Sequence, residues 1–316
     1  MKIKIKISPL SYPKRIDKVI YEHLINYSRS DIKRWIIKKK VYVNQVLIDK
    51  PSTKLSGREC ILIEDIENSK EEYYPKNIPL NVVHEDGSII VIDKQHNLCV
   101  HPGKDHEQDT LLNALIHHFP KLKDVPRAGI VHRLDKDTSG LMIVAKSSHI
   151  QNQLMKLFKI KKVRKEYEAV VYGNINIHGT IDQPIGRHPV DRRKNFVCRF
   201  GKKSRTQYYV EENFNGFTRL TLSLESGRRH QARVHMKYIN HPIVGDPLYH
   251  DKKLSKMKKN HISNSVKVEH IISRQALHAK KLSILHPTLK KMITWKSDVP
   301  KDITHLVHTL RENKKL

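Results

Sequence analysis

The sequence predicts an α+β protein with two domains. Three observations predict this: a compact helix–helix–strand pattern near the N-terminus, a polar stretch around residues 65–80, and a longer region in which buried strands alternate with helices. A chain of 316 residues also exceeds a single small binding fold and can bury a substantial core.

The N-terminal pattern covers residues 15–64. Apolar side chains at helical spacing predict a first helix over residues 16–24, and Ser28 or Ser30 is expected to cap a second helix. Short strands follow at residues 41–43 and 46–48, and the alternation of Lys and Ile in residues 1–7 is typical of another strand.

The polar stretch at residues 65–80 contains Pro75, Pro79 and few apolar side chains, as an exposed linker does. We therefore expect a small domain at residues 1–75, a larger domain at 80–305 and a C-terminal tail at 306–316.

The larger region mixes both kinds of element. Residues 89–92 and 141–145 are expected to form buried strands, residues 220–224 a half-buried strand, and residues 111–119 a helix ended by a proline. Residues 251–270 are rich in Lys, Asn, Ser and His, which predicts a mobile basic loop.

The charge of the chain points to a polyanionic partner. Lys and Arg number 60 against 32 Asp and Glu, giving a formal charge of +28. Nucleic acid is favoured over an anionic membrane surface. Because no apolar run is long enough to span a membrane and the three cysteines form no close pair, we expect a soluble, cytoplasmic chain, monomeric by virtue of its charge.

The sharpest local signal is the loop at residues 129–140, Gly-Ile-Val-His-Arg-Leu-Asp-Lys-Asp-Thr-Ser-Gly, which opens onto the buried strand at 141–145. Such loops commonly carry catalytic groups, and this one offers cations, two carboxylates and two hydroxyls. The same string is also typical of an ordinary capped turn. The residues alone leave both interpretations open.

The N-terminal pattern resembles an S4 RNA-binding domain. The resemblance lies in Arg-Ile-Asp-Lys at 15–18, Tyr-Ser-Arg-Ser at 27–30 and Val-Tyr-Val-Asn at 41–44. Cations of the second helix could simply be solvated, but their density favours phosphate contact. The resemblance implies RNA contacts from Arg15, Arg29, Lys33 and Arg34.

Residues 80–305 resemble the RluA/RluD-type RNA pseudouridine synthases. His-Arg-Leu-Asp at 132–135 with Thr-Ser-Gly at 138–140 carries the catalytic motif, and segments 165–173 and 224–246 match two others. The sequence departs from the family pattern at Gln95, Arg229 and Ala232. The resemblance implies a mixed, mainly antiparallel sheet and a substrate in large-subunit ribosomal RNA.

The resemblance also implies roles for single residues. Asp135 would be the catalytic carboxylate, kept ionised by Arg233, and Tyr167 would stack on the extruded base. A carboxylate could attack C1′, remove the C2′ proton or balance an electron-deficient sugar, and the sequence does not choose among these routes. RNA contacts are expected from His132, Arg133, Arg187 and Arg228.

A helix over residues 228–239 would place Arg229, Arg233 and Lys237 on one face. No metal-ligand or phosphate-loop motif occurs, so we expect neither a metal nor a cofactor. Two other functions stay open: a noncatalytic RNA-binding or ribosome-assembly protein, in which Asp135 is a turn residue, and a metal-dependent nuclease.

Overall fold

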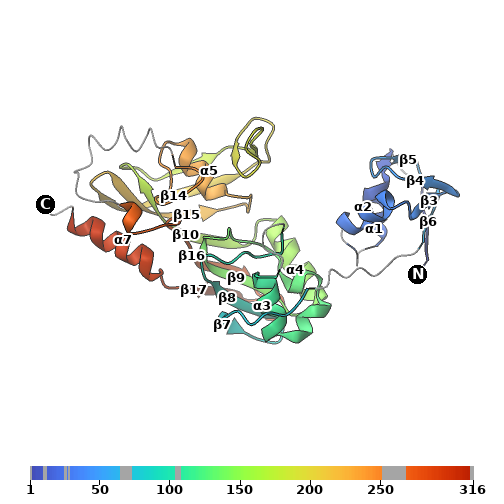
Figure 1. Cartoon of the computed structure of the whole chain (residues 1–316), viewed down its shortest axis with the longest axis horizontal. Helices are drawn as coiled ribbons and strands as arrows, with labels where there is room; N and C mark the ends of the chain where they lie inside the picture. Colours follow the sequence, from blue (N-terminus) through green and yellow to red (C-terminus); the bar gives the residue numbers. More distant parts are fainter. Residues whose placement is uncertain are drawn as a thin grey trace. The chain divides into compact units, whose positions relative to one another are not determined.

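The computed structural model of the chain describes residues 2–9, 13–24, 27, 29–64, 73–103, 108–250 and 268–313. Contacts divide the chain into two compact units, Met1–Glu72 and Tyr73–Leu316 (Figure 1). The predicted cap residue Ser28 lies outside the described residues, as do the predicted linker up to residue 72 and the predicted basic loop up to residue 267.

The N-terminal unit packs two helices on a four-stranded antiparallel sheet of order β1-β6-β3-β4, and β2 pairs with β5 beside it. The apolar faces of both helices and alternate residues of β3 and β6 form its core. Its elements are β1 (Ile3–Lys6), β2 (Lys14–Arg15), α1 (Ile16–His23), α2 (Arg29–Ile37), β3 (Val41–Val43), β4 (Val46–Ile48), β5 (Lys54–Leu55) and β6 (Cys60–Ile63).

The C-terminal unit is built on a nine-stranded mixed sheet of order β11-β14-β15-β10-β16-β9-β8-β7, with β17 also paired to β16. Its elements are β7 (Asn81–Glu85), β8 (Ile89–Lys94), α3 (Leu111–His118), η1 (Pro120–Asp124), η2 (Pro126–Gly129), β9 (Ser139–Ala145), α4 (Ser148–Lys159), β10 (Arg164–Tyr172), β11 (Gly179–Asp182), β12 (Ile185–Arg187), β13 (Asn195–Val197), β14 (Arg205–Phe214), β15 (Phe217–Leu224), α5 (Gln231–Tyr238), η3 (Val268–His270), β16 (Leu277–Leu285), β17 (Met292–Lys296) and α7 (Lys301–Glu312).

Strand pairing in this sheet is antiparallel except between β16 and β9, where His278 is opposite Ser139 and Ala279 is opposite Gly140. The two strands approach closely there. A Cβ on Gly140, whose φ is +114°, would lie 2.4 Å from the carbonyl oxygen of Ala279. Glycine is therefore required where the predicted catalytic loop enters the sheet.

Both faces of the sheet are covered at β8 and β9. Alternate residues of β8 and β9 pack on Leu154 of α4, and the intervening residues pack on α3 (Figure 1). This confirms the predicted α+β class and its mainly antiparallel sheet.

Two predicted boundaries differ from the structure. Residues 73–80 are not linker, because Tyr73, Ile78 and Leu80 pack against the core of the larger unit. Residues 306–312 are not a tail, because they belong to α7, whose Leu306 and Leu310 are buried in the same core. Helix α7 is thus an integral part of the C-terminal unit.

Candidate active site

The loop before β9 is held by side chains from other parts of the unit. Lys94 Nζ donates to the carbonyl of Lys136 at 2.9 Å, Arg274 Nη1 to that of Asp137 at 3.0 Å, and Gln275 Nε2 to Thr138 Oγ1 at 3.0 Å. Three successive residues after Asp135 are therefore fixed, which gives its carboxylate a defined position.

Lys94 is the most deeply buried cation of this support. Its ammonium group also donates to the carbonyls of Gln95 and Leu98, at 2.8 and 3.0 Å. Burial lowers the pKa of Lys94 to about 7, against the opposing charges of Asp137 and Asp135. Because three carbonyls accept from one nitrogen, the protonated form satisfies all of them and a neutral amine, with two N–H bonds, does not.

Asp135 and Arg233, separated by 98 residues in the sequence, form an ion pair. Asp135 Oδ2 lies 3.0 Å from Arg233 Nη1. The other edge of the guanidinium forms a two-pronged pair with Asp246, with Nε at 2.6 Å from Oδ2 and Nη2 at 2.8 Å from Oδ1. Burial opposes the charge of Arg233, but the hydrogen bonds and charges of Asp246 and Asp135 outweigh it and raise its pKa.

The helix that carries Arg233 is shorter than predicted. It begins at Gln231, because His230 adopts a left-handed conformation with φ of 58°, so Arg229 lies in the preceding loop. Arg233 is buried rather than on a solvated helix face.

Tyr167 comes from β10 and lines the same pocket as Asp135, a small space of about 50 Å³ that opens to solvent. Its ring is buried, and this burial together with the charge of Asp135 raises the pKa of its hydroxyl. Leu224, Ala232 and Leu277 supply apolar walls. The phenol therefore stays neutral beside the carboxylate.

His230 and Asp246 were not predicted as site residues. His230 Nε2 lies 3.7 Å from Asp135 Oδ1, and burial lowers its pKa to about 4. Arg229 Nε, which can only donate, bonds to His230 Nε2, so Nε2 is the acceptor nitrogen of the neutral ring. His230 Nδ1 therefore carries the hydrogen and donates it to the Tyr249 hydroxyl at 2.8 Å. His230 lies before α5 in a left-handed conformation, so helical spacing could not have marked it as a site residue.

Of the residues predicted to contact RNA around this pocket, three arginines are exposed and one histidine faces inward. Arg133 and Arg228 line the pocket with exposed side chains, and Arg187 is exposed at the end of β12. His132 instead faces inward: its Nε2 accepts from the Ile143 amide at 3.0 Å, and burial lowers its pKa to about 3. His132 is therefore neutral at pH 7, and its Nε2 is occupied by a hydrogen bond within the protein.

The departures from the family pattern also fall here. Arg229 and Ala232 both line the Asp135 pocket, whereas Gln95 contributes its carbonyl to Lys94. The first two substitutions therefore alter the pocket wall, and the third leaves the support of the loop intact.

In the N-terminal unit, Arg15 and Arg29 both pair with buried Asp17, at 3.0 and 2.9 Å, and remain about half exposed. Arg34 pairs with Asp31 at 3.2 Å, and Lys33 is exposed. The guanidinium groups are held in place yet reachable from solvent.

Among the described residues, no group of three or more His, Cys, Asp or Glu side chains could hold a metal ion. No helix within the described ranges is long and apolar enough to cross a membrane.

Family comparisons agree with this architecture. The sequence pattern of the family described as RNA pseudouridylate synthase matches residues 88–238, and that of the S4 domain matches residues 14–59. The fold and site thus define an RNA-modifying enzyme with an attached S4 domain.

Relatives match nearly the whole chain. Ribosomal large subunit pseudouridine synthase D of Escherichia coli O157:H7 is 43% identical over 94% of this chain and 90% of its own length. The protein of that name from Vibrio cholerae is 41% identical over 96% of this chain and 93% of its own length. The chain therefore belongs to the RNA pseudouridylate synthase family, whose members are isomerases. Human RNA Pseudouridylate Synthase Domain Containing 4 shares the fold, with a TM-score of 0.56 and 26% identity over 73% of this chain and 93% of that chain.

Proposed function

We propose that this chain converts specific uridines of large-subunit ribosomal RNA to pseudouridine, with Asp135 as the catalytic residue. The observation that carries the proposal is the 3.0 Å pairing of a partly exposed Asp135 carboxylate with the buried guanidinium of Arg233. The printed names of relatives at 41–43% identity support the choice of RNA.

The isomerisation breaks the bond from ribose C1′ to base N1, turns the base, and joins C1′ to C5. It consumes no electrons and no nucleotide triphosphate. A single carboxylate beside the sugar can attack C1′, remove the C2′ proton or balance a cationic sugar. In each route Arg233 orients Asp135 through the 3.0 Å ion pair and supplies its counter-charge.

The uridine must leave its stack before Asp135 can reach it. In this proposal Tyr167 receives the extruded base against its ring, and Arg133 binds the adjacent phosphate or fills the vacated stack. The apolar walls formed by Leu224 and Leu277 exclude water from the turning base.

The remaining RNA is bound by the exposed cations. Arg187 and Arg228 bind phosphates near the pocket, and the S4 domain contributes Arg15, Arg29, Lys33 and Arg34. The chain acts as a monomer in the cytoplasm, where large-subunit ribosomal RNA is present.

Mapping of pseudouridines in total RNA tests this proposal. Cells lacking the protein should lose pseudouridine at a few large-subunit positions, and wild-type protein, but not Asp135→Asn, should restore them. Unchanged maps, or restoration by the variant, would favour a noncatalytic RNA-binding protein. RNA cleavage that a chelator abolishes would favour a nuclease.

A further inference from the structure

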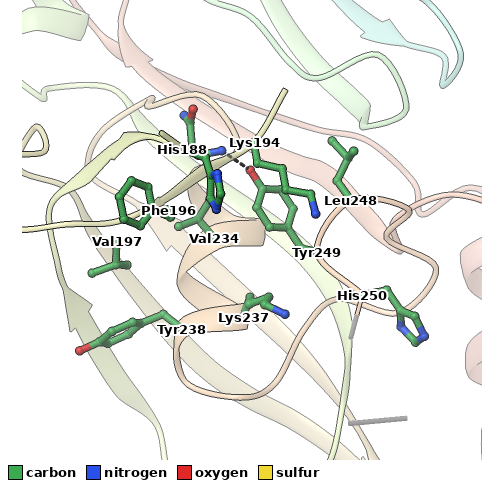
Figure 2. A pocket seen from close by; sticks show the side chains of 11 residues that line it. His188, Lys194, Phe196, Val197, Val234, Lys237, Tyr238, Leu248, Tyr249 and His250 are labelled. Carbon is green, nitrogen blue, oxygen red and sulfur yellow. Dashed lines mark hydrogen bonds between the residues drawn. The ribbon is translucent and has the colours of Figure 1, made fainter. Parts of the chain in front are cut away.

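A second and larger cavity, of about 570 Å³, lies next to the active site (Figure 2). Helix α5 lines both spaces with different residues: Ala232 and Arg233 line the Asp135 pocket, whereas Val234, Lys237 and Tyr238 line this cavity. Its volume lies within the range of roughly 300–1,000 Å³ that small-molecule and cofactor sites occupy.

The opposite wall of this cavity comes from the β12–β13 hairpin and from residues 248–250. Aromatic rings dominate the lining of the cavity as a whole: Phe196 of β13 and Tyr238 of α5 are partly exposed, Tyr249 is buried, and the His188 ring lies 5.4 Å from that of Phe196. Flat faces of this kind accept a nucleobase irrespective of its identity.

The charged groups of the cavity are cationic. Lys194 and Lys237 line it, and Figure 2 draws both beside the aromatic rings. None of the described lining residues is acidic. Aromatic faces next to ammonium groups suit a ligand that combines a base with a phosphate, and they suit an acidic peptide less well because it lacks a planar ring.

Hydrogen bonds join this cavity to His230, whose Nε2 lies 3.7 Å from Asp135 Oδ1. The backbone N–H of Asn195 donates to the Tyr249 hydroxyl at 2.8 Å, and that hydroxyl lies 2.8 Å from His230 Nδ1. The Tyr249 ring in turn lies 5.1 Å from the Arg233 guanidinium. An occupant of the cavity would therefore contact Tyr249, whose ring packs against the guanidinium that pairs with Asp135.

We propose that this cavity binds an unpaired nucleotide of the same RNA strand, flanking the uridine that enters the Asp135 pocket. Its base packs against Phe196 and Tyr238, and its phosphate pairs with Lys194 and Lys237. The site would select targets by requiring a second unpaired nucleotide. The proposal rests on the proposed function, because it takes the target strand as its ligand.

Photocrosslinking tests the occupant directly. Full-length Asp135→Asn protein is bound to large-subunit ribosomal RNA transcribed with 4-thiouridine, irradiated and digested, and the crosslinked peptides are identified by mass spectrometry. Crosslinks in residues 194–197 or 237–238 are expected. Crosslinks confined to other parts of the chain would overturn the proposal, and so would crosslinks in these two segments that persist with an RNA made wholly double-stranded.

Affinity provides a second measurement. Tyr238→Leu and Phe196→Leu should each weaken RNA binding about five- to a hundredfold, the loss that accompanies one base–aromatic stack. Tyr209→Leu removes a similarly exposed ring on β14 and should change affinity less than twofold. Equal affinities for all three variants, with melting temperatures unchanged, would contradict the proposal.

Both measurements report binding alone, so they stand even if the chain forms no pseudouridine. Conversely, if Tyr238→Leu forms pseudouridine and binds RNA normally, the proposal of a flanking site is wrong, whereas the proposed function still holds.

Discussion

Arg233 binds Asp135 through Nη1, the guanidinium nitrogen that its two-pronged pair with Asp246 leaves available. The second carboxylate therefore fixes the plane of the guanidinium, and that plane determines where the oxygens of Asp135 lie. The orientation of the Asp135 carboxylate thus depends on Asp246, a residue that does not line the pocket.

Asp246→Asn should lower turnover more than RNA affinity. The variant keeps the shape of the side chain but leaves buried Arg233 without its principal counter-charge, and removal of one partner of a buried pair costs about 3–5 kcal/mol. Single-turnover rates and RNA affinities measure the predicted difference, and urea unfolding measures the loss of stability. Asp191→Asn, at an exposed pair with Arg193, is the control and should change neither. Full activity of Asp246→Asn would show that Asp135 needs no such support.

Tyr167→Phe should reduce the rate of isomerisation while RNA affinity holds, because the ring still stacks but the hydroxyl beside Asp135 is lost. Tyr167→Leu should weaken both, since the aromatic face is removed. Rates under single turnover and filter-binding affinities separate the two. If Tyr167→Phe loses affinity and rate equally, its proposed role is wrong.

Lys94→Met should slow turnover at least tenfold with little change in RNA binding. Methionine fills the space but cannot donate, so the carbonyls of Gln95, Leu98 and Lys136 lose their common partner. Each buried carbonyl left without a donor costs about 1–3 kcal/mol. Lys123→Met, at an exposed position, is the matched comparison. Wild-type rates in both variants would mean that the loop keeps its position unaided.

The N-terminal unit should lose stability in acid. Burial would raise the pKa of Asp17, but hydrogen bonds from Arg15 and Arg29 outweigh it and lower the pKa. A carboxylate with a lowered folded-state pKa stabilises the fold above its unfolded value of about 3.9, and this contribution disappears as pH falls through the folded value.

Trp35 fluorescence in a Trp295→Phe chain reports on this unit alone, because the chain has two tryptophans. The urea midpoint should fall as the pH is lowered below about 4, and Asp17→Asn should flatten that dependence. If the urea midpoint of Asp17→Asn falls in acid as much as that of the parent, the loss of stability comes from other carboxylates.

Local patterns predicted much of the fold. Apolar spacing located α1, α3, β8 and β9, because each buries one face or both against a core. The spacing of Ile303, Leu306, Val307 and Leu310 also marks α7 as an amphipathic helix, although the tail prediction did not use it. That signal was present in the sequence.

The site was predicted only in part. Asp135, Tyr167 and Arg233 were assigned through family resemblance, and the structure brings all three to one pocket. The pairing of Arg233 with Asp246 depends on how α5 packs against the turn after Gly245, which no local pattern encodes. The left-handed backbone of His230, which shortens α5 and brings the imidazole toward Asp135, is equally invisible to periodicity.

The most direct test of the central claim compares Asp135→Asn with Asp298→Asn, at an exposed position outside the site, on large-subunit ribosomal RNA, under single turnover and with RNA affinity measured in parallel. The account predicts that Asp135→Asn forms no detectable pseudouridine yet binds RNA as the parent does, and that Asp298→Asn forms it at near the parent rate. Pseudouridine formation by Asp135→Asn at the parent rate would contradict the account.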